Sequence, residues 1–377
     1  MDLFLRNTRV LFAKQQSDDL FVIDGRIQFH PPRKAPKLTG AGWFVLPGLV
    51  DSHAHLVTSP TLGVRGYTEA RETDPSELAK RIIRHLFEQR DGGVLGVRDA
   101  GASTGIVVEV MKTLDPDMPY LQAAGRFIAA PGRYLPNVAH EVSGHGILLA
   151  AEEEAARGGG WIKFIADSSH RDHPGSEPDI GWTLDEVKPA VDAARRAGAR
   201  IAIHATTAEA CEMAIALDVD SVEHGSRLKP EHLQKMARRG RAWTPTLAAF
   251  RIFLERIRSG EWDMPEASFA EAVDSTERLL RQAVATGVTI LCGSDAALGH
   301  GKVGLEVLAF IDAGLTPERA IRAATIDAWK FLGFGVPLGE NSVADFVAYE
   351  RDPLADPSVL LTPRLVVRNG RVVAGHP

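Results

Sequence analysis

Short apolar segments alternate with longer amphipathic segments through the middle of the chain, from residue 46 to residue 335. The apolar segments have the length and the Val, Ile and Leu content of buried strands, whereas the amphipathic segments repeat apolar residues every three or four positions, as helices do. Several amphipathic segments begin after Ser, Thr or Pro and end at Gly, as helix capping favours. The strands are expected at 44–52, 94–100, 119–125, 161–167, 200–205, 220–225, 241–247 and 288–294.

Eight strand–helix units in this stretch predict an α/β fold, a (β/α)8 barrel of the TIM type, because such barrels usually need ~250 residues. An open doubly wound sheet is the alternative, but no Gly-rich dinucleotide-binding segment follows the first strand. Long polar loops at 128–146, 167–182 and 296–303 follow expected strands. Barrel enzymes place their active sites on loops of this kind.

The two ends of the chain have a different pattern, with short strand-like runs and tight turns. Asp24-Gly25 and Asn369-Gly370 are two-residue hairpin signals between such runs. We therefore expect residues 1–45 and 336–377 to pair into one small β-sandwich domain, which the barrel of residues 46–335 interrupts.

Composition restricts the class of protein. The 377 residues carry 43 basic and 49 acidic side chains, a net charge of −6, so a nucleic-acid surface is not expected. No apolar run approaches the ~20 residues that cross a bilayer, and the first residues lack the pattern of a signal peptide. The two cysteines, Cys211 and Cys292, cannot form a disulfide framework, which favours a reducing, cytoplasmic setting.

Polar residues stand at the ends of five of the expected strands. His53 and His55 are two residues apart on one extended strand, so both side chains can reach one ion. The other strand ends carry Lys163, His204, His224 and Asp295. A purely structural explanation is also open: the histidines could be core residues, and Lys163 could form a salt bridge with Asp295. These explanations are independent, and all of them would have to be true together to exclude a metal site. Neutral imidazoles with a carboxylate suit Zn²⁺, and also Mn²⁺ or Co²⁺.

These residues lie within longer motifs that resemble the amidohydrolase superfamily. The motifs are VLPGLVDSHAH, IKFIAD, IAIHATTAEACEMAIALDVDSVEHG, TPTL, GSDA and AIRAATIDAWKFLG, and the tail GENSVADFVAYERDPL extends the resemblance over nearly the whole chain. The branch it resembles most is the binuclear, carboxylated-lysine branch that includes Xaa-dipeptidases, prolidases and imidazolonepropionase.

The resemblance implies a site with two divalent metal ions, zinc being the first expectation. His53, His55 and Asp295 would bind one ion, and His204 and His224 the other. Lys163 would be carboxylated by CO₂, and its carbamate would bridge the two ions. A bridging hydroxide would then act as nucleophile, with Asp295 accepting and passing on its proton.

The loop at 128–146 holds further candidates. His145 lies in a Gly-His-Gly segment that resembles one in the dipeptidase-like branch, so we expect it to assist catalysis by stabilising the oxyanion. His140, Tyr134 and Arg133 are expected substrate contacts. A solvated loop is the alternative for all four, and Ile147 stands where the branch usually has an acidic residue.

For other polar residues near these candidates we expect structural roles or no role in catalysis. Glu223 should point away from its neighbour His224 and form an outer salt bridge. Arg98 is expected to brace the barrel through Asp99. His170 and His173 lie in a polar loop after Lys163, and we expect them to be exposed, although they could touch substrate.

The predicted function is therefore a metal-dependent amidohydrolase that cleaves a C–N bond in an amide, dipeptide, N-acyl amino acid or cyclic amide. Ester, lactone or phosphotriester hydrolysis is the alternative on the same site. A mononuclear deaminase is disfavoured by Lys163 and by Thr207, which stands where those enzymes usually have Glu. A non-catalytic scaffold would have lost ligands that are all present here. The expected partner is a small-molecule substrate, and a homo-oligomer is possible.

Overall fold

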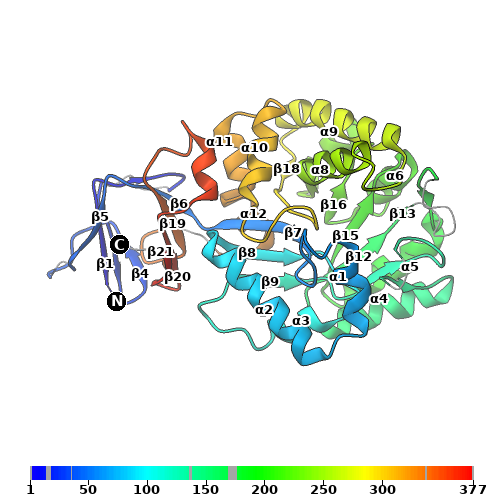
Figure 1. Ribbon diagram of the computed structural model, residues 1–377, viewed down its shortest axis with the longest axis horizontal. Coiled ribbons are helices and arrows are strands. Elements are labelled where there is room, and N and C mark those ends of the chain that lie inside the picture. The colour runs from blue at the N-terminus through cyan, green and yellow to red at the C-terminus, as the bar shows by residue number, and fades with distance from the viewer. Residues whose placement is uncertain are drawn as a thin grey trace.

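The apolar segments of the middle of the chain form parallel strands, as their pattern predicts (Figure 1). The computed structural model describes residues 2–13, 18–34, 36–135, 138–168, 176–335 and 338–375. One parallel sheet has three strands, β7 (Leu49–Ala54), β8 (Val94–Asp99) and β9 (Tyr120–Ala123). A second parallel sheet has seven, in the order β11 (His140–Glu141), β10 (Phe127–Ala129), β12 (Trp161–Ile165), β15 (Arg200–Ala205), β16 (Ser221–His224), β17 (Ala242–Thr244) and β18 (Thr289–Ile290).

Single bridges join the two parallel sheets at both sides. Ala123, at the end of β9, pairs with Gly160, just before β12. On the other side Ala54 of β7 pairs with Asp295, whose N–H donates to the His53 carbonyl at 2.7 Å. Seven of the expected strands each contain one observed strand, whereas the first, 44–52, covers β6 (Phe44–Pro47) and the start of β7. The central strands form two bridged sheets rather than one continuous closed sheet. Two short strands of the second parallel sheet were not expected: β10 overlaps the start of the expected loop at 128–146, and β11 lies within that loop.

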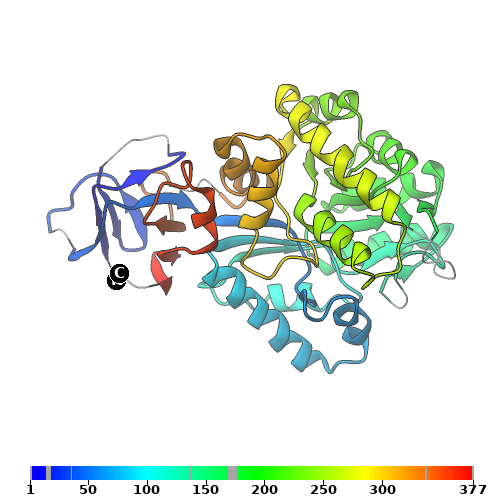
Figure 2. The same cartoon turned by 45° about the horizontal axis from the view of Figure 1, so that its top comes forward.

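Helices follow the strands and pack around their outer side (Figures 1 and 2). Local side chains cap the N-termini of some of these helices: Asp74 accepts the Ser76 N–H at 2.9 Å, and Thr183 and Glu186 form a capping box. The helices are α1 (Val64–Thr68), α2 (Pro75–Asp91), α3 (Ile106–Met111), α4 (His145–Arg157), α5 (Leu184–Arg196), α6 (Ala208–Ala216), α7 (Pro230–Arg238), α8 (Leu247–Arg258), α9 (Glu266–Thr286), α10 (Gly304–Asp312), α11 (Pro317–Ala323) and α12 (Ile326–Leu332). Within the described ranges, none of these helices has the length and apolar character needed to cross a bilayer.

The two ends of the chain form two small sheets that share one hydrophobic cluster. The first sheet contains β1 (Leu3–Arg6), β3 (Leu20–Ile23), β4 (Arg26–Gln28) and β5 (Leu38–Ala41). The second contains β2 (Arg9–Val10), β6 (Phe44–Pro47), β19 (Phe346–Tyr349), β20 (Leu365–Arg368) and β21 (Arg371–Gly375). β6 pairs antiparallel with β19, so segments three hundred residues apart in sequence lie side by side (Figure 1).

Both expected hairpin turns are confirmed. Asp24-Gly25 joins β3 to β4, and Asn369-Gly370 joins β20 to β21, with positive φ at all four residues. Such φ values suit Gly and Asn in two-residue hairpins. The two turns also meet, because a Cβ added to Gly370 would lie 2.1 Å from the Gly25 Cα. Only glycine fits where the two backbones approach this closely.

The chain passes from the small sheets to the central strands at Gly48, close to the expected start of the barrel at residue 46. β6, up to Pro47, belongs to the small sheets, and β7 begins the central strands at Leu49. A Cβ on Gly48 would lie 2.5 Å from the Leu95 side chain, so the backbone passes β8 at close range. The expected boundary at residue 336 lies outside the described residues.

Candidate metal centre

Three of the predicted metal ligands lie close enough together to hold one ion. Each of His53, His55 and Asp295 offers a ligand atom within 4.8 Å of the other two. His55 Nε2 lies 3.3 Å from an Asp295 carboxylate oxygen. β7 supplies His53, His55 follows directly after β7, and the segment after β18 supplies the aspartate where it bridges to Ala54.

His204 and His224 extend this group from β15 and β16. Their rings are 4.6 Å apart between centroids, and the His224 ring is 5.1 Å from that of His53. Four histidines and one aspartate therefore form a single cluster at the carboxyl ends of the strands, in which His53, His55 and His224 are buried and His204 and Asp295 are partly exposed.

Lys163 lies in β12, between β10 and β15, with a side chain that is 1% exposed. Among the described residues it has no hydrogen bond and no ion pair, so the Lys163–Asp295 salt bridge considered from the sequence is not formed. Burial lowers the pKa of its amino group to about 8. Burying an ammonium without a partner costs free energy of folding. A modification that turned the amino group into an anion lying between two cations would remove that cost.

The charges in the cluster suit metal binding. Burial, followed by the nearby Lys163, lowers the pKa of His53 to about 4 and that of His204 to about 3, so both imidazoles are neutral at physiological pH. Burial opposes ionisation of Asp295, but the hydrogen bond to His55 and the neighbouring imidazoles hold its pKa well below the ordinary range. Neutral imidazole and ionised carboxylate are the forms that bind divalent ions.

Each histidine has one ring nitrogen held by a neighbour. His55 Nδ1 lies 2.8 Å from the Gly101 carbonyl, and His224 Nδ1 lies 2.7 Å from the Thr246 hydroxyl. The Nε2 of His204 lies 3.4 Å from Asp167. Partners of this kind fix the ring orientation and leave the other nitrogen for a metal.

Glu223 corrects a prediction. It is fully buried rather than part of an outer salt bridge, and its carboxylate lies 2.6 Å from His53 Nδ1 and 2.8 Å from Arg98 Nη2. Strand alternation fails here because His224 has φ 65°, a left-handed conformation, so both neighbours can serve one site. Arg98 likewise pairs with Glu223, not with Asp99 as expected, and its Nε donates to the Ser52 carbonyl.

Of the four residues predicted in the loop at 128–146, Tyr134 lies at the cluster, and its neighbour Arg133 is paired with another residue. The ring of Tyr134 lies 6.0 Å from that of His204, and its N–H donates to Ser168 at 2.7 Å. Arg133 is paired with Asp179 and donates to the Ser168 carbonyl at 3.2 Å, so its charge is already balanced.

The structure does not bring His145 or His140 to the cluster. His145 is exposed at the first turn of α4, and none of its described contacts is to a predicted metal ligand. His140 lines a separate pocket of about 610 Å³ together with Arg71, Ser103 and Arg126. The expected exposure of His170 and His173 lies outside the described residues.

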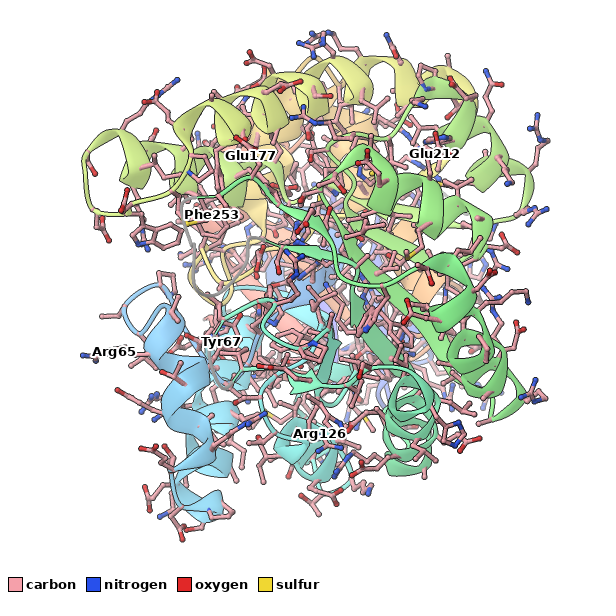
Figure 3. The ribbon with its side chains drawn as sticks, turned by 90° about the vertical axis from the view of Figure 1, so that its right-hand side faces the viewer. Arg65, Tyr67, Arg126, Glu177, Glu212 and Phe253 are labelled. Carbon is pink, nitrogen blue, oxygen red and sulfur yellow. The ribbon has the colours of Figure 1, made fainter. Side chains whose placement is uncertain are left out.

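Two aromatic residues at the cluster were not identified from the sequence. Tyr67 on α1 is 4% exposed, and its ring lies 5.4 Å from that of His55 (Figure 3). Phe250 on α8 has its ring 5.2 Å from that of His224. Neither residue follows a strand directly, so strand-end position gave no signal for either.

The comparison with protein families decides the assignment. A model described as the amidohydrolase family matches residues 44–373. The chain belongs to the amidohydrolase family. It is therefore a hydrolase that acts on carbon–nitrogen bonds. The enzymes of this family act on small molecules and generally use metal ions.

Individual relatives match most of the chain. An uncharacterised protein of Mycobacterium tuberculosis is 33% identical over 362 residues, which cover 93% of this amidohydrolase and 91% of that protein. Ochratoxinase of Aspergillus niger is 26% identical over 368 residues, 88% of this chain and 76% of that protein.

Solved structures share the fold. A Xaa-Pro dipeptidase with methionine bound in its active site has a TM-score of 0.82 and 23% identity, with 99% of both chains covered. The A. niger ochratoxinase structure has a TM-score of 0.81 and 22% identity, covering 99% of this amidohydrolase and 96% of that chain.

Proposed function

We propose that this amidohydrolase is a metal-dependent enzyme that cleaves an amide-type C–N bond at a centre with two divalent ions, zinc being the preferred metal. The observation that carries the proposal is a buried Lys163 that has no hydrogen bond or ion pair among the described residues and lies next to four histidines and the ionised Asp295. A cluster of core residues gives no reason to keep such a lysine there.

The donor set fits the proposed ions. His53, His55 and Asp295 would hold one ion, as their mutual distances allow, and His204 and His224 would hold the second. Lys163, as a CO₂-derived carbamate, would bridge the two. When bound, the ions supply an acidified water as nucleophile and polarise the carbonyl of the substrate.

The protein's own groups would perform the proton transfer and the positioning. Asp295 would accept the proton of the attacking water and pass it to the leaving nitrogen, which requires the ionised state that its lowered pKa provides. Glu223 and Arg98 would hold the His53 ring in one orientation. Tyr67 and Tyr134 would limit the access of bulk water from the side of β7 and β10.

We also propose the finer architecture: a (β/α)8 barrel of residues 46–335, with a small β-sandwich domain of residues 1–45 and 336–377. The bridges at Ala123 and Ala54 support a circular arrangement of strands, and the hydrophobic cluster shared by the two small sheets supports the sandwich.

Metal analysis and a substrate panel test the function. The purified protein should contain about two divalent ions per chain, and Lys163→Ala should reduce both the metal content and turnover. The panel should contain dipeptides, N-acyl amino acids, cyclic amides, esters, lactones and a phosphotriester, with ammonia, amino acid and acid release followed separately. Metal content below one ion that Lys163→Ala leaves unchanged would contradict the binuclear centre, and turnover of esters alone would contradict amide cleavage.

A further inference from the structure

A group of aromatic side chains lies beside the metal centre and has no part in holding it. We call it the α8 aromatic cluster, which consists of Phe250, Phe253, Trp262 and Phe269. Phe250 lies 6.1 Å from Phe253 and 5.8 Å from Phe269, and Phe253 stacks on Trp262 at 5.1 Å between ring centroids.

The cluster reaches the reacting centre through Phe250, whose ring is 5.2 Å from the ring of His224. All four aromatic residues are only half-buried, in contrast to the core aromatics Trp243 and Phe310, which are fully buried. Figure 3 looks toward the carboxyl ends of the strands and shows Phe253 on this face of the molecule. An apolar surface is therefore available next to one of the predicted metal ligands.

The surface is held rigidly. The buried Glu306 of α10 accepts the N–H groups of Leu247 and Ala248 at 2.8 and 2.7 Å, which fixes the first turn of α8. Further along α8, Arg251 pairs with Glu277 of α9 at 2.8 Å. A pre-formed surface of this kind gains affinity from apolar contact without having to be ordered by the substrate.

We infer that the enzyme selects substrates that carry a bulky apolar group, above all an aromatic ring, on one side of the scissile C–N bond, and that Phe250 is the residue that determines this selection. The inference rests on the proposed amide hydrolysis. The ring of the substrate would pack on Phe250 and toward Phe253 while the amide lies at the metal centre beside His224.

The test compares phenylalanine with alanine in otherwise identical substrates. The zinc-loaded protein is assayed with Ala-Ala, Phe-Ala and Ala-Phe, so that either side of the bond can carry the ring. At least one of the two phenylalanine dipeptides should have a kcat/KM about tenfold to a hundredfold above that of Ala-Ala, as burial of a phenyl ring implies. Phe250→Ala should bring that ratio close to one.

Two further variants distinguish specificity from damage to the fold. Phe250→Leu keeps an apolar side chain and should retain an intermediate ratio. Phe87→Ala removes an exposed phenylalanine from the outer face of α2, and its ratio should equal that of the unmodified protein. A ratio near one in the unmodified protein, or a high ratio that Phe250→Ala leaves unchanged, would overturn the inference.

A binding measurement separates this inference from the proposed function. Calorimetric titration of the zinc-loaded protein with N-acetylphenylalanine and N-acetylalanine should show tighter binding of the aromatic compound, and Phe250→Ala should remove the difference. If no amide is cleaved but this difference is found, the hydrolytic proposal fails and the selection of aromatic groups stands. If amides are cleaved without any such difference, only the selection fails.

Discussion

Replacement of Glu223 by Gln changes one buried charge and little else. The Glu223 side chain is fully buried, and the side chain of Arg98 is 1% exposed. Burial opposes ionisation of Glu223, but Arg98 and His53 hold its pKa well below the ordinary range. The glutamine has nearly the same shape, so its effects report the loss of the negative charge.

Two magnitudes follow from the contacts. Breaking a buried ion pair by neutralising one partner typically costs about 3–5 kcal/mol, because the remaining charge stays buried without compensation. That is a large part of the ~5–15 kcal/mol that stabilises an ordinary domain. Loss of the charged acceptor at His53 Nδ1 should also weaken metal binding about 10- to 100-fold, as for other groups that orient a ligand histidine.

The assay has two parts. Urea denaturation of the metal-free protein measures the free energy of unfolding, and competition with a chromophoric chelator measures zinc affinity. Glu212→Gln is the matched control, because Glu212 is half-exposed and pairs with Lys229 on the surface, where such a pair contributes less than about 1 kcal/mol. If Glu223→Gln alters neither quantity more than Glu212→Gln does, the assigned role of Glu223 is refuted.

Three other predictions concern pH, metal removal and a turn. Burial raises the pKa of Glu306 to about 8, so between pH 4.5 and 8 the folded protein binds more protons than the unfolded chain. The free energy of unfolding should therefore fall by up to about 1.4 kcal/mol per pH unit as pH rises through this window. Glu306→Gln should remove that slope from urea denaturation curves measured at several pH values, and an identical slope in the variant would contradict the assignment. Removal of metal by a chelator should lower the melting temperature, because zinc at a hundred times its dissociation constant stabilises by about 2.7 kcal/mol; calorimetry with and without zinc checks this, and Lys163→Ala should show a smaller difference. Gly370→Ala should lower the free energy of unfolding by at least about 1 kcal/mol more than Gly240→Ala in the same denaturation assay, because both glycines have positive φ but, of the two, only residue 370 would place a Cβ against another backbone. Equal losses of unfolding free energy would show that the close approach to Gly25 contributes nothing.

The position of polar residues at the ends of expected strands predicted those site residues whose direction depends only on the local backbone. His53 lies in β7 and His55 directly after it, so the two-residue spacing of an extended chain places both at one site, and Lys163 and His204 follow from the same rule in β12 and β15. The pattern of apolar segments likewise predicts most of the central strands, because buried parallel strands are apolar along their whole length, but it misses the short strands β10 and β11.

The same reasoning failed where the backbone leaves the extended region or where another element supplies the side chain. Glu223 was misassigned because His224 has a positive φ that no pattern of residue types reveals. Tyr67 and Phe250 reach the site from helices whose position depends on long-range packing, such as the contact between Glu306 and the start of α8. His145 was favoured for its glycine neighbours, yet His145 lies at the exposed start of α4, a helix whose buried face is formed by other residues.

The pairing of β6 with β19 has a practical consequence for handling the protein. The described residues begin at residue 2, next to β1, and end at residue 375 in β21, so both ends lie at the small sheets, at the end of the molecule opposite the carboxyl ends of the central strands (Figure 1). A tag, a fusion partner or a solid support attached at either terminus therefore leaves the face that carries Tyr67 and Phe253 open to solution. Immobilisation through either end should preserve access of substrate to the enzyme.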